Sequence, residues 1–215
     1  MRYTSVLFDL DGTLLDTLGD LTAAMNRTLT RHGLPERTRQ QMRAALGNGA
    51  RRLMELSVPT GTDSTLFETL LAEYNADYAA HCRIETAPYP GVAALLRQLH
   101  AQGRKLAIVS NKPDEAVRAL RADFFADAVP IAVGETAAIR RKPAPDMLLA
   151  AMDQLGADPA GTVFVGDSEV DIATARAAGL PCISVLWGFR DRDVLDRAGA
   201  QHFAADIAQL QALLG

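Results

Sequence analysis

Five short apolar runs are spaced along the chain, and segments with helical spacing separate most of them. The runs cover residues 6–8, 106–109, 129–133, 162–165 and 182–186. Continuous apolar runs of this length predict strands that are covered on both faces. Helices are expected at 92–102, 113–122, 145–155 and 171–178. This alternation predicts an α/β protein with a Rossmann-like, doubly wound parallel sheet.

One stretch, from about residue 18 to residue 82, contains no strand-like run. Its apolar residues recur at helical spacing instead, as in Leu21, Ala24, Met25, Thr28 and Leu29. Loops are expected at 33–36 and 58–61, where Gly and Pro interrupt the pattern. We therefore predict a small helical cap, residues 17–83, inserted after the first strand of a core that comprises residues 1–16 and 84–215.

Composition narrows the partners of the chain. Its 215 residues carry a net charge of −4 and no basic stripe, which argues against nucleic acid. Asp9 and Asp11 interrupt the apolar N-terminal stretch, so a signal peptide or membrane span is not expected there. Cys82 and Cys182 have no metal-ligand spacing and are expected to be free thiols in a cytoplasmic protein.

The strongest chemical signal is the segment from Asp9 to Thr13, which directly follows a predicted strand. Ligands bind at the carboxyl ends of strands in such sheets. Two carboxylates at Asp9 and Asp11 could attack phosphorus and handle the proton of the leaving group. Gly12 allows a sharp turn, and Gly12 and Thr13 are candidates for substrate binding. The alternative is a turn in which Asp and Gly only supply turn chemistry.

A second polar segment follows the predicted strand 106–109. Pro113 suits the first position of a helix. Ser110 and Asn111 would then lie at a helix N-terminus, where a hydroxyl and free N–H groups can hold a phosphate. An ordinary helix cap is the alternative.

Two further segments complete the set. Lys142 is one of only three lysines in the chain, and its compact ammonium could neutralise a phosphate and hold carboxylates apart. Asp167 and Asp171 follow another strand, where oxygen ligands suit Mg²⁺. The alternatives are a surface lysine and acidic residues that favour a helix dipole.

In this order, the four segments resemble the motifs of haloacid dehalogenase superfamily phosphatases. The matching residues are Asp9-x-Asp11-Gly12-Thr13, Ser110, Lys142 and Gly166-Asp167-x-x-x-Asp171. The resemblance implies that Asp9 is the nucleophile, that Asp11 is the acid and base, and that Ser110 and Lys142 hold phosphoryl oxygens. It also implies Mg²⁺ as the cofactor, with a ligand set of Asp9, Asp11, Asp167 and Asp171.

The predicted cap bears on the substrate, expected to be a small phosphate ester. Residues 47–52, 88–91 and 187–189 resemble phosphoglycolate phosphatases, which makes phosphoglycolate the leading candidate. Asn48 and Arg51 could bind a substrate carboxylate, or the arginines there could simply be solvated. Open alternatives are a sugar-phosphate phosphatase, a phosphomutase and a phospho-aspartate signalling module. We expect a monomer or a homodimer.

Overall fold

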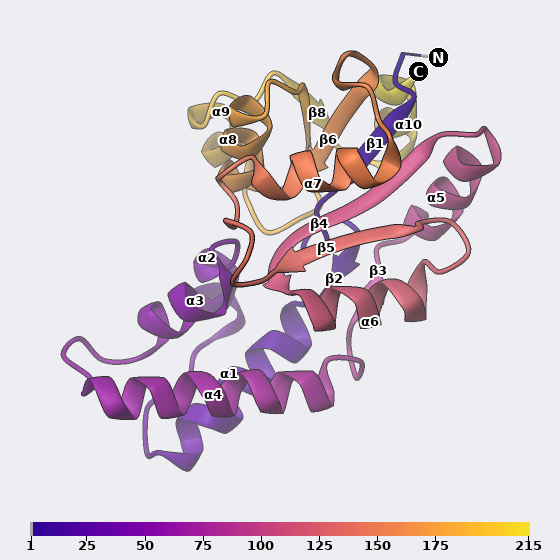
Figure 1. Cartoon of the computed structure of the whole chain (residues 1–215). Coiled ribbons are helices and arrows are strands. Elements are labelled where there is room, and N and C mark those ends of the chain that lie inside the picture. Colours follow the sequence, from indigo (N-terminus) through magenta and orange to yellow (C-terminus); the bar gives the residue numbers. More distant parts are fainter. Residues whose placement is uncertain (1) are drawn as a thin grey trace. The chain divides into compact units, whose positions relative to one another are not determined.

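A six-stranded parallel sheet forms the centre of the larger of two compact units in the computed structural model, which describes residues 2–215. The strands are β1 Ser5–Phe8, β4 Lys105–Pro113, β5 Ile131–Glu135, β6 Thr162–Gly166, β7 Cys182–Val185 and β8 His202–Ala204. Their order is β5-β4-β1-β6-β7-β8, and all neighbours are parallel (Figure 1). Successive strands therefore extend first to one side of β1 and then to the other. The carboxyl end of β1 lies where ligands bind in such sheets.

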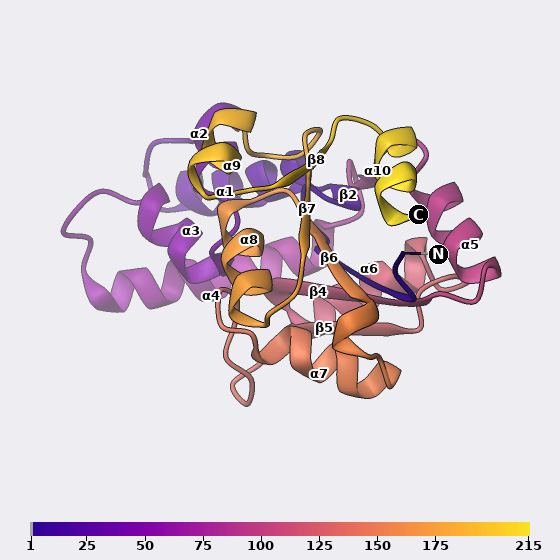
Figure 2. The ribbon, with the colours of Figure 1, turned by 90° about the horizontal axis from the view of Figure 1, so that it is seen from above.

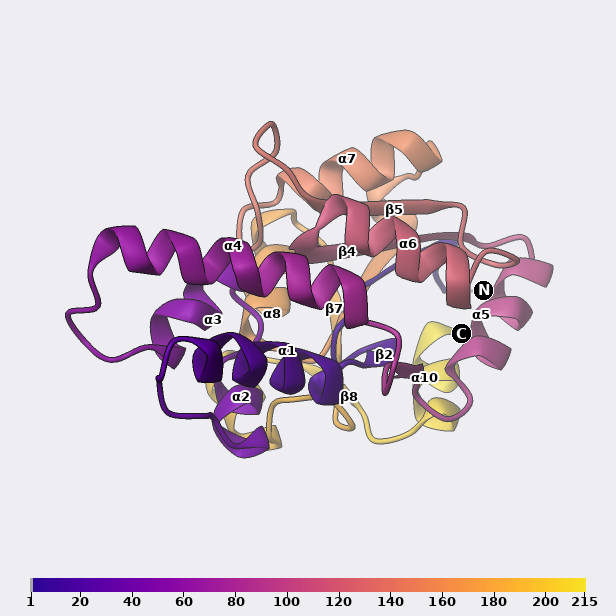
Figure 3. The ribbon, with the colours of Figure 1, turned by 90° about the horizontal axis from the view of Figure 1, so that it is seen from below.

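Helices cover both faces of this sheet, so the predicted doubly wound arrangement is confirmed. They are α5 Val92–Ala101, α6 Asp114–Phe124, α7 Asp146–Leu155, α8 Glu169–Ala177, α9 Arg192–Arg197 and α10 Ile207–Leu214, with a short 3₁₀ turn at Pro159–Gly161. Figure 1 shows α7 and α6 on opposite faces of β4 and β5. Seen from below, α5 and α6 lie on the near side of these strands (Figure 3). Helix α10 packs beside α5 (Figure 2).

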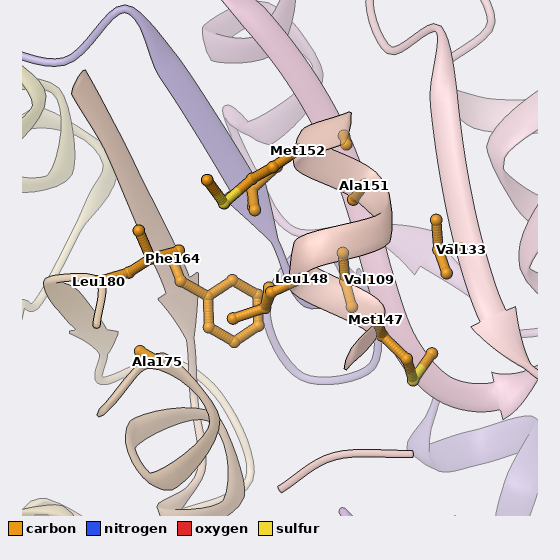
Figure 4. Close-up of a cluster of buried hydrophobic side chains, with 11 residues drawn as sticks. Val109, Val133, Met147, Leu148, Ala151, Met152, Phe164, Ala175 and Leu180 are labelled. Carbon is orange, nitrogen blue, oxygen red and sulfur yellow. The ribbon is translucent and has the colours of Figure 1, made fainter. Parts of the chain in front are cut away.

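The core on the face of α7 and α8 consists of aliphatic and aromatic side chains (Figure 4). Leu7, Val109 and Phe164 come from β1, β4 and β6, where alternate residues point to one face of the sheet. They meet Leu148 of α7 and Ala175 of α8. This packing fixes the three strands whose carboxyl ends carry the predicted site residues.

Strand β4 is longer than the sequence predicted. The apolar pattern predicted an end at Ser110 and a helix from Pro113, but the backbone stays extended through Pro113. Val109 pairs with Val133 and Pro113 with Glu135 of β5, with a register shift between them. Helix α6 begins only at residue 114. The prediction that Ser110 and Asn111 lie at a helix N-terminus was therefore wrong, because pairing with β5 continues past the apolar residues.

The second unit, residues 16–87, is mainly helical. Its helices are α1 Leu18–Arg31, α2 Arg39–Ala45, α3 Gly49–Ser57 and α4 Ser64–His81. α1 packs against α4 (Figure 3), and the residues predicted to form its apolar face, such as Leu21 and Met25, are buried. The carboxylate of Asp20 accepts hydrogen bonds from the amides of Ile84, Glu85 and Thr86 at 2.9 to 3.0 Å, which ties the two ends of the unit together.

The chain leaves the first unit and returns to it at adjacent points. The amide of Tyr89 donates to the carbonyl of Leu14 at 3.1 Å. The short strands β2 Leu15–Asp16 and β3 Ala87–Pro88 form a two-stranded sheet at this point. Neither Cys82 nor Cys182 forms a disulfide. Within residues 2–215, no helix combines the length and the hydropathy that a membrane span requires.

Candidate active site

Three carboxylates and one ammonium group are buried together at the carboxyl edge of the sheet. Asp9 follows β1, Asp167 follows β6, and Asp171 lies in the first turn of α8. One oxygen of each carboxylate lies within 4.8 Å of the others. Nζ of Lys142 donates to Oδ1 of Asp9 and to Oδ1 of Asp171, each at 2.7 Å. Folding thus brings together four predicted site residues from three separate segments.

This crowding raises the pKa values of the acidic groups. Burial is the largest influence on the pKa of Asp9; Lys142 opposes it, but Asp171 and Asp167 add to it, so the pKa is raised well above its usual range. Burial, with the charge of Asp171, raises the pKa of Asp167 to about 7. Burial works against the charge of Lys142, but Asp171 and Asp9 outweigh it and raise its pKa. One ammonium therefore does not balance the three buried carboxylates.

The turn after Asp9 is packed tightly against Asp167. Gly12 has a φ of 85°, and a Cβ atom there would lie 2.4 Å from Oδ2 of Asp167 and 2.8 Å from the ring of Phe189. Only glycine fits this conformation and this approach. The hydroxyl of Thr13 donates to Oδ1 of Asp167 at 3.3 Å. Gly12 and Thr13 thus shape the carboxylate site, and their role in substrate binding stays a prediction.

Asn111 connects β4 to the segment that carries Lys142. Its Oδ1 accepts from the backbone N–H of Lys142 at 2.8 Å, and its Nδ2 donates to the carbonyl of Lys142 at 3.0 Å. Ser110, one residue earlier, is buried, and its Oγ accepts from the backbone N–H of Lys112 at 3.4 Å. The amide of Asn111 therefore positions the lysine backbone, while its predicted contact with substrate stays a prediction.

Two residues at the site were given no role by sequence reasoning. Lys112 donates from Nζ to Oδ1 of Asp11 at 2.9 Å. The backbone N–H of Phe189 donates to Oδ2 of Asp167 at 2.7 Å. The scarcity of lysine in the chain was a signal for Lys112. Nothing in the residue type of Phe189 indicates that its amide faces a carboxylate.

The predicted substrate-binding residues Asn48 and Arg51 belong to the helical unit. Asn48 is the N-cap residue of α3, without a capping hydrogen bond from its side chain. The guanidinium of Arg51 forms two hydrogen bonds with Glu68, at 2.8 and 2.9 Å, and both side chains are about half exposed. Arg51 is thus a half-exposed arginine paired with Glu68, and the role of Asn48 and Arg51 in substrate binding stays a prediction.

The donor set at this edge fits a divalent cation. Asp9 and Asp167 are buried carboxylates with raised pKa values, and an oxygen of each lies within 4.8 Å of the other. Oxygen donors of this kind suit a hard cation such as Mg²⁺. In Asp171, Oδ1 accepts from Nζ of Lys142, and Oδ2 accepts from the backbone N–H and the hydroxyl of Ser168. Its contacts suit a residue that holds the lysine beside the cation site.

The doubly wound sheet and its cluster of carboxylates and lysine define an α/β protein with a charged site at the carboxyl end of its central strand. The family model described as haloacid dehalogenase-like hydrolase matches residues 6–185. The chain therefore belongs to the haloacid dehalogenase-like hydrolase family, as the sequence motifs predicted.

Known proteins resemble the chain over most of its length. A phosphoglycolate phosphatase of Xanthomonas campestris pv. campestris is 35% identical over 88% of this chain and 86% of its own. An N-acetylmuramic acid 6-phosphate phosphatase of Pseudomonas aeruginosa is 33% identical over 96% of this chain and 90% of its own. A crystal structure of a Lactobacillus delbrueckii subsp. bulgaricus protein is 35% identical, with a TM-score of 0.94 over 100% of this chain and 99% of that one. These relatives support phosphatase chemistry and differ in the substrates that they are named for.

Proposed function

We propose that this protein is a Mg²⁺-dependent phosphatase that hydrolyses a small phosphate monoester through an aspartyl-phosphate on Asp9. The observation that carries the proposal is the environment of Asp9. Lys142 holds its Oδ1 at 2.7 Å, and no side chain or amide within residues 2–215 donates to its Oδ2. A carboxylate with one oxygen fixed and the other available suits in-line attack on phosphorus.

In the first step, Oδ2 of Asp9 forms a bond to phosphorus while the bond from phosphorus to the ester oxygen breaks. Asp11 supplies a proton to the departing oxygen, which leaves as an alcohol. Ser110 and Lys142 hold phosphoryl oxygens during this transfer.

In the second step, Asp11 takes a proton from a water molecule, and the water oxygen attacks the phosphorus. The bond between phosphorus and Asp9 breaks, which releases inorganic phosphate and restores the carboxylate. Asp11 thereby ends the cycle with the proton that it needs for the next one.

A bound Mg²⁺ would neutralise charge between the phosphate and the nucleophile, and Asp9, the Asp11 carbonyl and Asp167 would hold it, with Asp171 at or near the site. The raised pKa values of Asp9 and Asp167 support this assignment, because a buried carboxyl needs a cation beside it to stay ionised at neutral pH.

We assign residues 1–16 and 84–215 to a core domain that performs the chemistry, and residues 17–83 to a cap domain that selects the substrate. The cap would exclude water during transfer. Asn48 and Arg51 are the residues proposed to read the substrate, and Arg51 would have to exchange Glu68 for a substrate carboxylate. A cytoplasmic location and a monomer or homodimer remain part of the proposal.

Phosphoglycolate is the leading substrate, since several of the similar curated proteins carry that name. N-acetylmuramic acid 6-phosphate is a second candidate, supported by the Pseudomonas aeruginosa relative. A panel of phosphate esters with Mg²⁺ and with EDTA, compared by kcat/KM, separates these candidates from other sugar phosphates. A phosphomutase would show little net phosphate release.

Asp9→Asn tests the nucleophile. Asparagine keeps the volume of the side chain, and its amide oxygen can accept the hydrogen bond from Lys142. We therefore expect a folded protein without measurable turnover. Wild-type turnover by folded Asp9→Asn would contradict the assignment. A signalling module would instead show phosphorylation of Asp9 without repeated turnover.

A further inference from the structure

Lys112 is a buried lysine that the steps above do not use. Its Nζ lies 2.9 Å from Oδ1 of Asp11; 3% of the lysine side chain and 20% of the aspartate side chain are exposed. The register of the sheet explains the pair. Phe8 of β1 lies opposite Ile108 of β4, so the residues just after β1 are carried toward the end of β4, where Lys112 lies. The pair is thus fixed by the two central strands.

Each of two buried lysines contacts an aspartate of the first motif. A buried ammonium is costly unless a hydrogen-bonded anion faces it. Lys142 faces Asp9, and Lys112 faces Asp11. The third lysine of the chain, Lys105, is exposed and donates to a backbone carbonyl. Both buried lysines therefore hold an aspartate to which the proposed reaction gives a chemical role.

Asp11 depends on Lys112 for its orientation. Within residues 2–215, the carboxylate of Asp11 accepts a hydrogen bond from Lys112 alone, at Oδ1. Its Oδ2 accepts none, so this oxygen is available to exchange a proton. A carboxylate on a turn rotates freely about its last bond unless a partner holds it, and proton transfer requires hydrogen-bond reach.

We propose that Lys112 is a positioning residue that holds Oδ1 of Asp11 and so directs Oδ2 to the departing oxygen. This inference rests on the proposed function, in which Asp11 is the general acid. A general acid contributes about 10²- to 10⁴-fold to the transfer step. Misplacement by about 1 Å can remove roughly 10²-fold.

Two substrates with different leaving groups test the proposal. An alkyl phosphate, such as 2-phosphoglycolate or the best alkyl ester of the panel, needs a proton on its leaving oxygen. p-Nitrophenyl phosphate does not, because p-nitrophenolate leaves readily as an anion. We measure kcat/KM for both esters in wild type, Lys112→Met, Lys112→Arg and Asp11→Asn. Lys105→Met, at the far end of the same strand, is the matched control.

The expected result is a fall of roughly 10- to 100-fold in the alkyl-to-aryl ratio of kcat/KM for Lys112→Met. Lys112→Arg keeps the charge and should fall less. Lys105→Met should keep the wild-type ratio. The ratio is independent of the folded fraction, because both esters are measured on the same preparation. The double variant Lys112→Met/Asp11→Asn should be no worse than Asp11→Asn, since both changes remove one function.

Failure of this inference is distinguishable from failure of the proposed function. If Asp11→Asn lowers the ratio and Lys112→Met leaves it at the wild-type value, Asp11 is the acid and Lys112 does not position it. An equal loss on both esters in Lys112→Met, with a lowered Tm, would assign Lys112 to stability alone and overturn the proposal. An unchanged ratio in Asp11→Asn would instead contradict the proposed reaction.

Discussion

Replacing Lys142 by methionine removes the ammonium group that contacts both Asp9 and Asp171, while keeping most of the side-chain volume. Both contacts are 2.7 Å, and the exposed fractions of the three side chains are 3%, 9% and 1%. In the variant, two carboxylates would face each other in a buried site. We expect a large loss of stability in the absence of divalent cations.

The magnitude follows from the geometry. At an effective dielectric constant of about 20, Coulomb's law gives roughly 6 kcal/mol for each contact at 2.7 Å. Dehydration of the ammonium offsets much of this, and removal of one partner from a buried ion pair costs about 3–5 kcal/mol. For a chain of this size, each kcal/mol changes Tm by roughly 2–4 °C, so we expect Tm to fall by about 6–20 °C.

The assay is thermal and urea unfolding in EDTA at pH 8 and at pH 5, with Lys105→Met as the control. The loss should be smaller at pH 5, because the raised pKa of Asp9 lets that carboxyl bind a proton and relieve the repulsion. The double variant Lys142→Met/Asp171→Asn should recover part of the stability, because it removes one of the two negative charges that face each other. A Lys142→Met protein as stable as wild type at pH 8 in EDTA would refute this account of the site.

Three further predictions concern other residues of the site. Burial raises the pKa of Asp167 to about 7 from 3.8, so between these values the folded state binds a proton that the unfolded state has lost. Without cations, stability should therefore fall as pH rises from about 4 to 7. Near pH 4, Asp167→Asn should therefore unfold at the same urea midpoint as the wild type. At pH 8 in EDTA, the variant should be more stable than the wild type by at most about 4 kcal/mol. Mg²⁺ should stabilise only the wild type. Asn111→Ala should lower the free energy of unfolding in urea by about 1–3 kcal/mol and should lower kcat, because the backbone of Lys142 loses both hydrogen bonds. Unchanged stability would show that water replaces these bonds. Gly12→Ala should fold but lose about 100-fold in kcat/KM, since a Cβ would displace Asp167, and full activity would contradict the tight approach.

Much of the core and its charged edge was predictable from the sequence, for a physical reason. β1 and β6 are continuous apolar runs, and each is followed at once by aspartates that could not stay in a covered strand. The end of β4 was not predictable in this way. Ser110, Asn111 and Lys112 are polar, yet they lie within β4: the side chains of Asn111 and Lys112 bond to the backbone of Lys142 and to Asp11, and the pairing with β5 resumes at Pro113.

Other parts carried too little signal. Strand β8 has three residues, too few for a period of two to be recognised, and it joins the sheet by pairing with β7. The hydrogen bond from Phe189 to Asp167 comes from a backbone amide, which every residue type except proline offers. The contact of Lys112 with Asp11 depends on the register between β1 and β4. The sequence does not show this register.

The hydrogen bond between the backbones of Tyr89 and Leu14 closes residues 15–88 into one long loop. Inside this loop, the hydrogen bonds from residues 84–86 to the carboxylate of Asp20 close a second, slightly shorter loop. The entropy lost on closing a loop grows with the logarithm of its length, and a doubling costs only about 0.6 kcal/mol. Insertions and deletions in the helical unit would therefore cost little loop-closure entropy at this junction, and all six strands of the large sheet lie outside residues 16–87. If residues 17–83 select the substrate, as proposed, the selectivity could change while the strands of the core stay the same.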